Sequence, residues 1–464
     1  MSAWRVTSAN PPRHGPGMDW QRCAKLHNHI IERGWVDSGR STDDLTRRAW
    51  WHYFGREVDL ARMEPTMVDF LKAAWHIDNN SISPQHNFHL FLAGLCAYGQ
   101  MWENGMYTDD EDDRNQRTYL TLYMANWGLR QSRPLGLVYN QRSHTTMQHI
   151  SMHDIKITTN GRQTWLPLET LLTGLLEMMD EGKVVATTPD YDGEQERLNP
   201  WIMPSFSERD LQDSLHAFEH LVDAIESRRP DHDATAPPEH GLFDPAWSDI
   251  RPTGGFARCF LEAARVPRFT YLAPGLRVAR QQPFQSTLPT DPDLLRPFLL
   301  FEGIGPAHRE TRRAPWGQDM PTSSFHPEFA DVPHLPAGLY LTESEPLASL
   351  PFEDGCKLFL PDPIGSNGYA RTSDNVQFGE DTISDSPTPV TRLVPRSTQV
   401  YQLGFNHYIE MHDVQLRRVL WRWVEMVSSG KWAVDADGVV GGMEKWRDAD
   451  SAEHWPDYQL PITC

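Results

Sequence analysis

Two carboxylates in the segment "FNHYIEMHDVQLRR" (residues 405–418) have a spacing that could support chemistry. The segment opens a helix predicted to continue to Gly430. With Asn406 near the helix cap, Glu410 and Asp413 lie one turn apart on one face, where they could bind a cation or a guanidinium or hold a proton. Acids at a helix start also have a purely structural explanation, because the helix dipole favours them there.

Two further motifs could bind metal ions. Asp109, Asp110 and Asp113 in "YTDDEDDR" have the D-D-x-x-D spacing that gathers carboxylates around magnesium and a diphosphate, although a run of acids also describes a solvated loop. His149 and His153 would share one face if the segment were helical, as in helical zinc sites. Hydrogen-bonded histidines without a metal are the alternative.

Basic residues concentrate in one stretch of an acidic chain. Residues 251–280 contain six arginines and one acid, and among the arginines we single out Arg258, Arg265, Arg268 and Arg277 as candidate substrate contacts. Arginines interleaved with Phe and Tyr suit a nucleic-acid backbone or a nucleotide. The alternative is that they neutralise the excess carboxylates of the protein itself.

The stretch "GCKLFLPDPIGSNGYARTSDN" (residues 355–375) turns from a predicted strand into a loop rich in glycine. Loops that leave a sheet in this way can present backbone amides to a ligand. Glu353 and Asp354 at the strand entrance and Arg371 at the loop exit add charges of both signs. Neither G-x-G-x-x-G nor a Walker loop is present.

The composition of the chain excludes several classes of protein. The chain has 464 residues, 17 tryptophans and a formal charge of −20, which favour a large folded core and disfavour a protein that coats DNA or an anionic membrane. No apolar run is long enough for a bilayer span, so we expect a cytoplasmic protein. The five cysteines are far apart and indicate neither a disulfide framework nor a zinc ribbon.

These candidate residues must be positioned by helices and strands. The helices and strands that the sequence predicts indicate an α+β fold, with a helix-rich N-terminal half and a C-terminal half that mixes strands and helices. The sequence predicts helices that include residues 64–77, with Pro65 at the start, 85–105, 164–182 and 207–229, with Ser207 as the cap. Short runs bounded by Pro and Gly predict strands after residue 247. The expected organisation is an N-terminal arm (1–40), a mainly helical region (41–229), a linker rich in proline (230–246) and a mixed α+β region (247–464).

Several segments together resemble a family of fungal proteins, the arginine-containing cyclodipeptide synthases. The resemblance spans most of residues 200–455 and is carried by "PWIMPSFSERDLQDSLHAFEHLVDAIE", "GFARCFLEAARVPRFTYLAPGL", "LFLPDPIGSNGYARTSD", "IEMHDVQLRRVLWRWVEMVSSGKWAVDADGVVGG" and "DADSAEHW". The family has an acidic D-D-x-x-E motif. Its nearest counterpart here has Asp450 and Glu453 in place but Ala449 at the first Asp.

This resemblance implies an enzyme that joins arginine, delivered as arginyl-tRNA, to a second aminoacyl-tRNA and cyclises the product to a diketopiperazine. Asp450, Glu453, Glu410 and Asp413 are the candidate catalytic carboxylates, and no cofactor or metal ion is expected. Aminoacyl esters are already activated, so the protein need only position them, accept a proton from an amine and exclude water. The alternatives are a magnesium-dependent enzyme of prenyl diphosphates and a non-catalytic acidic interaction protein.

Overall fold

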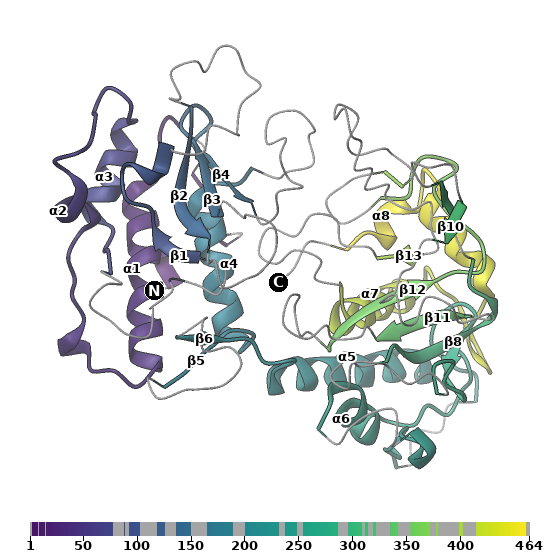
Figure 1. The fold of residues 1–464 in the computed structure, drawn as a ribbon. Helices are drawn as coiled ribbons and strands as arrows, with labels where there is room; N and C mark the ends of the chain where they lie inside the picture. Colours follow the sequence, from purple (N-terminus) through teal and green to yellow (C-terminus); the bar gives the residue numbers. More distant parts are fainter. Residues whose placement is uncertain are drawn as a thin grey trace. The chain divides into compact units, whose positions relative to one another are not determined.

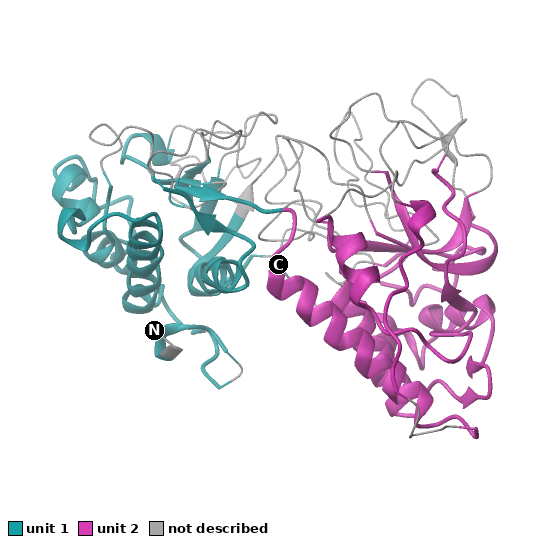
Figure 2. Ribbon diagram, turned by 90° about the horizontal axis from the view of Figure 1, so that it is seen from below, with its two compact units in different colours: residues 1–204, 407–410, 464 teal, residues 205–406, 411–463 magenta. Residues whose placement is uncertain are grey.

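The computed structural model describes residues 2–7, 9–13, 15–77, 88, 92–102, 118–125, 136–149, 165–188, 200–231, 237–247, 254–285, 296–308, 311–313, 319–321, 335–341, 353–371, 377–378, 399–401 and 414–460. Helices and antiparallel sheets occur together in them, which confirms the α+β class (Figure 1). The described residues form two compact units, unit 1 up to Pro204 and unit 2 from Ser205 onward (Figure 2).

Helix α1 is the longest element of unit 1, and it packs against α3 and α4. Helix α3 begins at Pro65, as the sequence predicts, since proline is suited to the first helical position. The helices and 3-10 turns of this unit are η1 (Ser2–Trp4), α1 (Trp20–Asp37), η2 (Thr42–Asp44), α2 (Trp50–Phe54), α3 (Pro65–Ala73), η3 (Gln100–Trp102) and α4 (Leu168–Asp180).

A four-stranded antiparallel sheet completes unit 1. Its strands follow one another in chain order, β1 (Leu92–Leu95), β2 (Tyr119–Ala125), β3 (Gly136–Asn140) and β4 (Thr145–His149), and β5 (Val185–Ala186) pairs with β6 (Trp201–Ile202). The helix expected over residues 85–105 is therefore wrong, because part of this apolar run forms β1. A short buried apolar run has no period that separates a strand from a helix.

Unit 2 is built on a larger antiparallel sheet. The strands lie in the order β13-β12-β11-β8-β7, and β14 also pairs with β12. The strands are β7 (Leu276–Val278), β8 (Phe298–Pro306), β11 (Pro336–Leu341), β12 (Gly355–Phe359), β13 (Gln399–Val400) and β14 (Val414–Gln415), with hairpins of β9 (Thr311–Arg313) and β10 (Asp319–Pro321) and of β15 (Val434–Asp435) and β16 (Gly438–Val439).

Two long helices, α5 (Glu208–Glu226) and α7 (Leu416–Ser428), pack against each other and supply the core of unit 2 together with its sheet. Phe218 of α5 stacks on Phe301 of β8 with their ring centroids 6.0 Å apart, and the ring of Phe301 packs against Trp423 of α7 with centroids 5.8 Å apart. Helix α5 is capped by Ser207 as its sequence predicts, and Ser207 and Asp210 are bonded reciprocally in a capping box. The remaining helical elements are η7 (Pro245–Trp247), α6 (Phe256–Ala263), η9 (Met443–Asp450) and α8 (Trp455–Tyr458).

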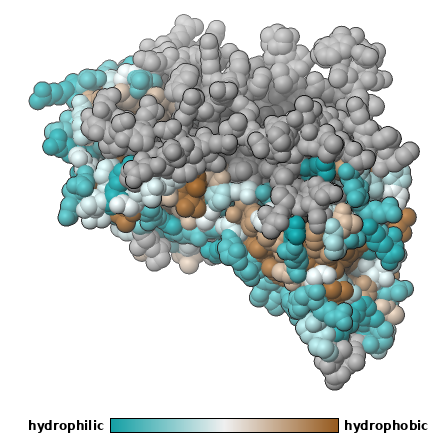
Figure 3. Space-filling view, turned by 60° about the horizontal axis from the view of Figure 1, so that its bottom comes forward, coloured by the Kyte–Doolittle hydropathy of each residue, from teal (hydrophilic) through white to brown (hydrophobic). Residues whose placement is uncertain are grey.

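The segment expected to link two regions lies within the range of unit 2. Its described part packs onto the C-terminal end of α6, because the backbone amides of Gly241 and Leu242 donate to the carbonyls of Ala264 and Leu261. On the face drawn in Figure 3, hydrophilic side chains cover much of the described surface and hydrophobic ones gather in patches. None of the described helices combines the length and apolar character needed to cross a membrane.

Candidate functional site

Among the predicted site residues that the structure describes, Asp450 accepts the most hydrogen bonds from the backbone. Its side chain is 3% exposed, and its two carboxylate oxygens accept four backbone N–H groups. The donors belong to the glycine-rich loop, namely Gly365 at 2.9 Å, Asn367 at 2.7 Å, Tyr369 at 2.8 Å and Ala370 at 2.9 Å. We call Asp450 together with loop residues 364–370 the loop anchor.

Local sequence explains why the loop can surround a carboxylate. Gly365 has a φ of +97° and Gly368 a φ of +81°, a conformation that glycine adopts without strain and that lets successive amides converge on an anion. Asp450 is the last residue of η9, and Trp446 in the same 3-10 helix is fully buried. The sequence indicated that the loop could present its backbone amides to a ligand, but four of these amides are occupied by a carboxylate of the same chain.

Other predicted residues lie at the surface close to the loop anchor along the chain. The Glu453 side chain is 83% exposed and lies 3.8 Å from His454. The guanidinium of Arg371, directly after the loop, lies 5.3 Å from the ring of Trp455. The two acids of the motif counterpart therefore have opposite surroundings, since Asp450 is enclosed by backbone amides whereas Glu453 is open to solvent.

The acids at the entrance of β12 lie at the starts of two helices. Glu353 accepts the backbone N–H of Phe256, the first residue of α6, at 2.8 Å. Asp354 is buried, and its backbone carbonyl accepts the N–H of Leu416, the first residue of α7, at 2.9 Å. A carboxylate at a helix N-terminus is stabilised by the unsatisfied amides and the helix dipole there. Glu353 thus fixes the start of α6.

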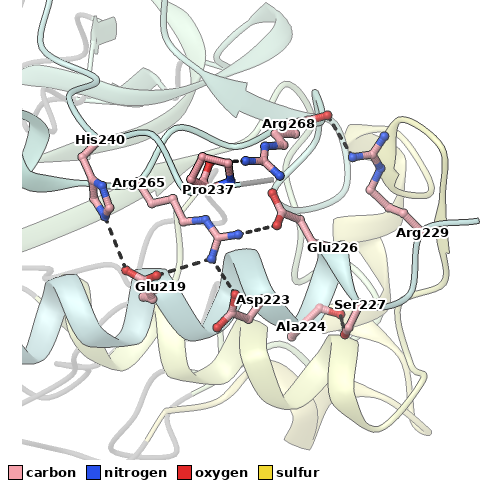
Figure 4. Close-up of polar contacts among 10 residues, drawn as sticks. All are labelled: Glu219, Asp223, Ala224, Glu226, Ser227, Arg229, Pro237, His240, Arg265 and Arg268. Atoms are coloured by element: carbon pink, nitrogen blue, oxygen red, sulfur yellow. Dashed lines mark hydrogen bonds and ion pairs between the residues drawn. The ribbon is translucent and has the colours of Figure 1, made fainter. Parts of the chain in front are cut away.

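Arg265 is surrounded by carboxylates of α5 (Figure 4). Its guanidinium contacts Glu219 at 3.3 Å, Asp223 at 2.5 Å and Glu226, which is almost fully buried. Burial works to lower the pKa of Arg265, but the hydrogen bond to Asp223 and the charges of the three acids outweigh it and raise the pKa. The three acids recur at helical spacing on one face of α5, a signal that sequence reasoning missed.

The other predicted arginines also bind groups of the same chain. Arg258 pairs with Glu262 at 2.8 Å and Arg277 with Glu302 at 2.7 Å, and Arg268 donates to the carbonyl of Pro237. For Arg258, Arg265 and Arg277 the geometry is the neutralisation of the protein's own carboxylates.

The remaining predicted residues lie outside the described residues, namely Glu410, Asp413, Asp109, Asp110, Asp113 and His153. The helix start expected near Asn406 is wrong, because Val414 and Gln415 form strand β14 against β12 and α7 begins only at Leu416. His149 ends strand β4, so no helix includes it. Among the residues that the structure describes, no group of three or more His, Cys, Asp or Glu side chains could hold a metal ion.

Unit 1 contains a buried polar contact that the sequence did not indicate. The Nδ1 atom of His27 lies 2.9 Å from the Tyr123 hydroxyl, and its Nε2 atom lies 2.8 Å from the carbonyl of Trp75. Since a carbonyl only accepts, Nε2 carries the proton and Tyr123 donates to Nδ1. Burial lowers the pKa of His27 to about 4. The ring therefore stays neutral at pH 7.

Known proteins offer no template for this chain. No family model matches it, no curated protein matches it, and no solved structure matches it.

Proposed function

We propose that this protein is a biosynthetic enzyme like the arginine-containing cyclodipeptide synthases, which forms a diketopiperazine from arginyl-tRNA and a second aminoacyl-tRNA. The loop anchor is the observation that carries the proposal. Asp450 comes from the last segment of the resemblance, and it binds four amides of the segment "LFLPDPIGSNGYARTSD", about 80 residues earlier in the chain. Two of the resembling segments therefore form one local structure.

Direct contacts also connect the other resembling segments within unit 2. Arg265, after α6, binds Glu219, Asp223 and Glu226 of α5. Arg417 of α7 binds Asp213 of α5 at 3.0 Å. These contacts place the resembling segments in one folded unit, as a single enzyme domain requires.

The proposal gives different roles to the predicted acids. Asp450 is a positioning residue, because both of its oxygens are occupied by the loop. Glu453 is a candidate acid that is open to solvent, and we assign to it the binding of the substrate guanidinium or the acceptance of a proton from an amine. Glu410 and Asp413 keep the same candidate roles. Arg268 and Arg280, the exposed arginines among the described part of residues 251–280, are the proposed contacts for tRNA phosphates.

The test is expression of the full chain in a host that supplies charged tRNAs, followed by mass spectrometry for arginine-containing diketopiperazines. We expect a new cyclic dipeptide, and we expect Glu453→Gln to lower its yield at least tenfold. Since the Glu453 side chain is 83% exposed, this substitution leaves the fold intact. Glu410→Gln tests the second candidate acid. Formation of the product from purified protein and aminoacyl-tRNA should be abolished by ribonuclease.

Glu425→Gln is the matched control, since Glu425 is also an exposed acid of unit 2, paired only at the surface with Arg422. It should leave the yield unchanged. Soluble protein that yields no arginine-containing diketopiperazine would overturn the proposal, and a product unaffected by either acid substitution would overturn the assigned roles. Activity on prenyl diphosphates that is lost with chelators would favour the magnesium-dependent alternative.

A further inference from the structure

Two histidines share the exposed face of α5, in a part of unit 2 that the proposed reaction does not use. His216 and His220 are four residues apart, and their Nε2 atoms lie 2.9 Å from each other. Both side chains are exposed. One ring therefore donates its Nε2 proton to the lone pair of the other, so both Nε2 atoms are directed at one point between the rings.

This separation fits a chelated metal ion. Bonds of about 2.0 to 2.1 Å from one ion to two imidazole nitrogens, at an angle between a right angle and a tetrahedral one, place the nitrogens about 2.9 to 3.4 Å apart. An ion that replaces the shared proton would thus need a shift of at most a few tenths of an ångström. Since α5 is capped and packed on α7, the helix holds the pair in place before any ion arrives.

The surroundings leave room for exchangeable ligands. Helix α5 carries six acids and one arginine, although Arg265 and Arg417 pair with four of these acids. A cavity of about 450 Å³ is lined by His216 together with Gln212, Asp213, Glu219 and Arg265, so water or a small oxygen ligand has room to complete the coordination. Trp421 of α7 covers the other side of the pair, with ring centroids 5.8 Å from His216 and 5.1 Å from His220.

We propose that His216 and His220 form a binding site for a divalent transition-metal ion, with copper(II) bound most tightly and nickel(II) and zinc(II) less tightly. Imidazole is a preferred ligand of these ions, and their affinities follow the general order in which copper(II) is highest. Magnesium and calcium prefer oxygen ligands and should not bind here. With two protein ligands the ion exchanges readily, unlike the closed four-ligand sites of structural zinc.

The test is calorimetric titration of the full chain with copper(II), after treatment with a chelator and removal of that chelator. The wild type should bind one equivalent that His216→Gln and His220→Gln each lose or bind at least tenfold more weakly. His240→Gln is the matched control, an exposed single histidine on the other side of Glu219, and it should retain that equivalent. Comparison among variants isolates the pair from the other histidines of the chain.

Two readouts on folded protein accompany the titration. Electron paramagnetic resonance of the first copper equivalent should show two imidazole nitrogens in the wild type and one in His220→Gln. Copper should also quench fluorescence from Trp421, seen as a part of the quenching that is missing in Trp421→Phe. Equal copper stoichiometry and affinity in the wild type and in both histidine variants would overturn the proposal, as would a first equivalent whose spectrum is unchanged by either substitution.

Discussion

Unit 1 and unit 2 each secure an irregular segment with one buried charged side chain, but the two side chains have opposite signs. In unit 2, Asp450 accepts four backbone N–H groups of the glycine-rich loop. In unit 1, Arg22 of α1 is 5% exposed and donates to four backbone carbonyls in residues 4–11, the part of the N-terminal arm that precedes α1. These carbonyls belong to Trp4, Arg5, Asn10 and Pro11.

The sign of each charged side chain matches the backbone groups that its partner segment can offer. The arm contains Pro11 and Pro12, and proline has no N–H but keeps its carbonyl, so a donor is needed to bind this part of the arm. The loop can offer amides because Gly365 and Gly368 adopt positive φ angles. Two glycines thus direct the loop amides at one carboxylate, whereas the four residues whose carbonyls Arg22 binds include no glycine.

The largest effect is expected at Asp450. Asp450→Asn replaces one carboxylate oxygen by an NH2 group that faces backbone N–H donors, so two buried amides lose their acceptor. We expect the free energy of unfolding to fall by roughly 3 to 5 kcal/mol. Urea denaturation of the full chain measures the loss, and limited proteolysis should find cleavage within residues 361–371.

Asp362→Asn is the control for this prediction, because Asp362 lies in the same loop region but is exposed and pairs with Arg447 only at the surface. Its effect should stay within about 0.5 kcal/mol. If Asp450→Asn were as mild as Asp362→Asn, the four hydrogen bonds would not be what orders the loop.

The sequence predicts the helices with clear caps and periods, such as α5 with Ser207, and the strand β12 before the loop. It also indicates that the loop amides could meet a ligand. It does not pair the loop with Asp450, because the two partners are about 80 residues apart and nothing local connects them. The same limit applies to β1, whose partner β2 follows more than 20 residues later. Contacts between residues far apart in the sequence determine both the conformation of the loop and the strand conformation of β1.

His27 in unit 1 is a further buried polar side chain, and unlike Asp450 and Arg22 it is buried in its neutral form. Its pKa is lowered to about 4 by burial, whereas an unfolded histidine has a pKa of about 6.5. Between these values the unfolded chain binds a proton that the folded chain does not, so stability falls as the pH drops from 6.5 to 4. The difference corresponds to about 3 kcal/mol at pH 4.

The measurement is urea denaturation of the full chain at pH 7 and pH 4.5, with hydrogen exchange followed in peptides from α1. His27→Gln should be less stable at pH 7 but should lose less on acidification than the wild type. His52→Gln, at an exposed position, should keep the wild-type pH dependence. Identical pH slopes in His27→Gln and the wild type would show that the imidazole does not titrate as burial requires.

The smallest effect is expected at Arg22, where Arg22→Lys keeps the charge but replaces a planar group that reaches four carbonyls with a single ammonium. We expect a loss of about 2 kcal/mol, confined mainly to the arm, because α1 keeps its packing. Trypsin should then cleave after Arg5 or Arg13 faster than in the wild type, whereas Lys25→Arg, at an exposed position on α1, should change nothing. Equal cleavage rates in Arg22→Lys and the wild type would mean that the ion pair of Arg5 with Asp180, and not Arg22, retains the arm.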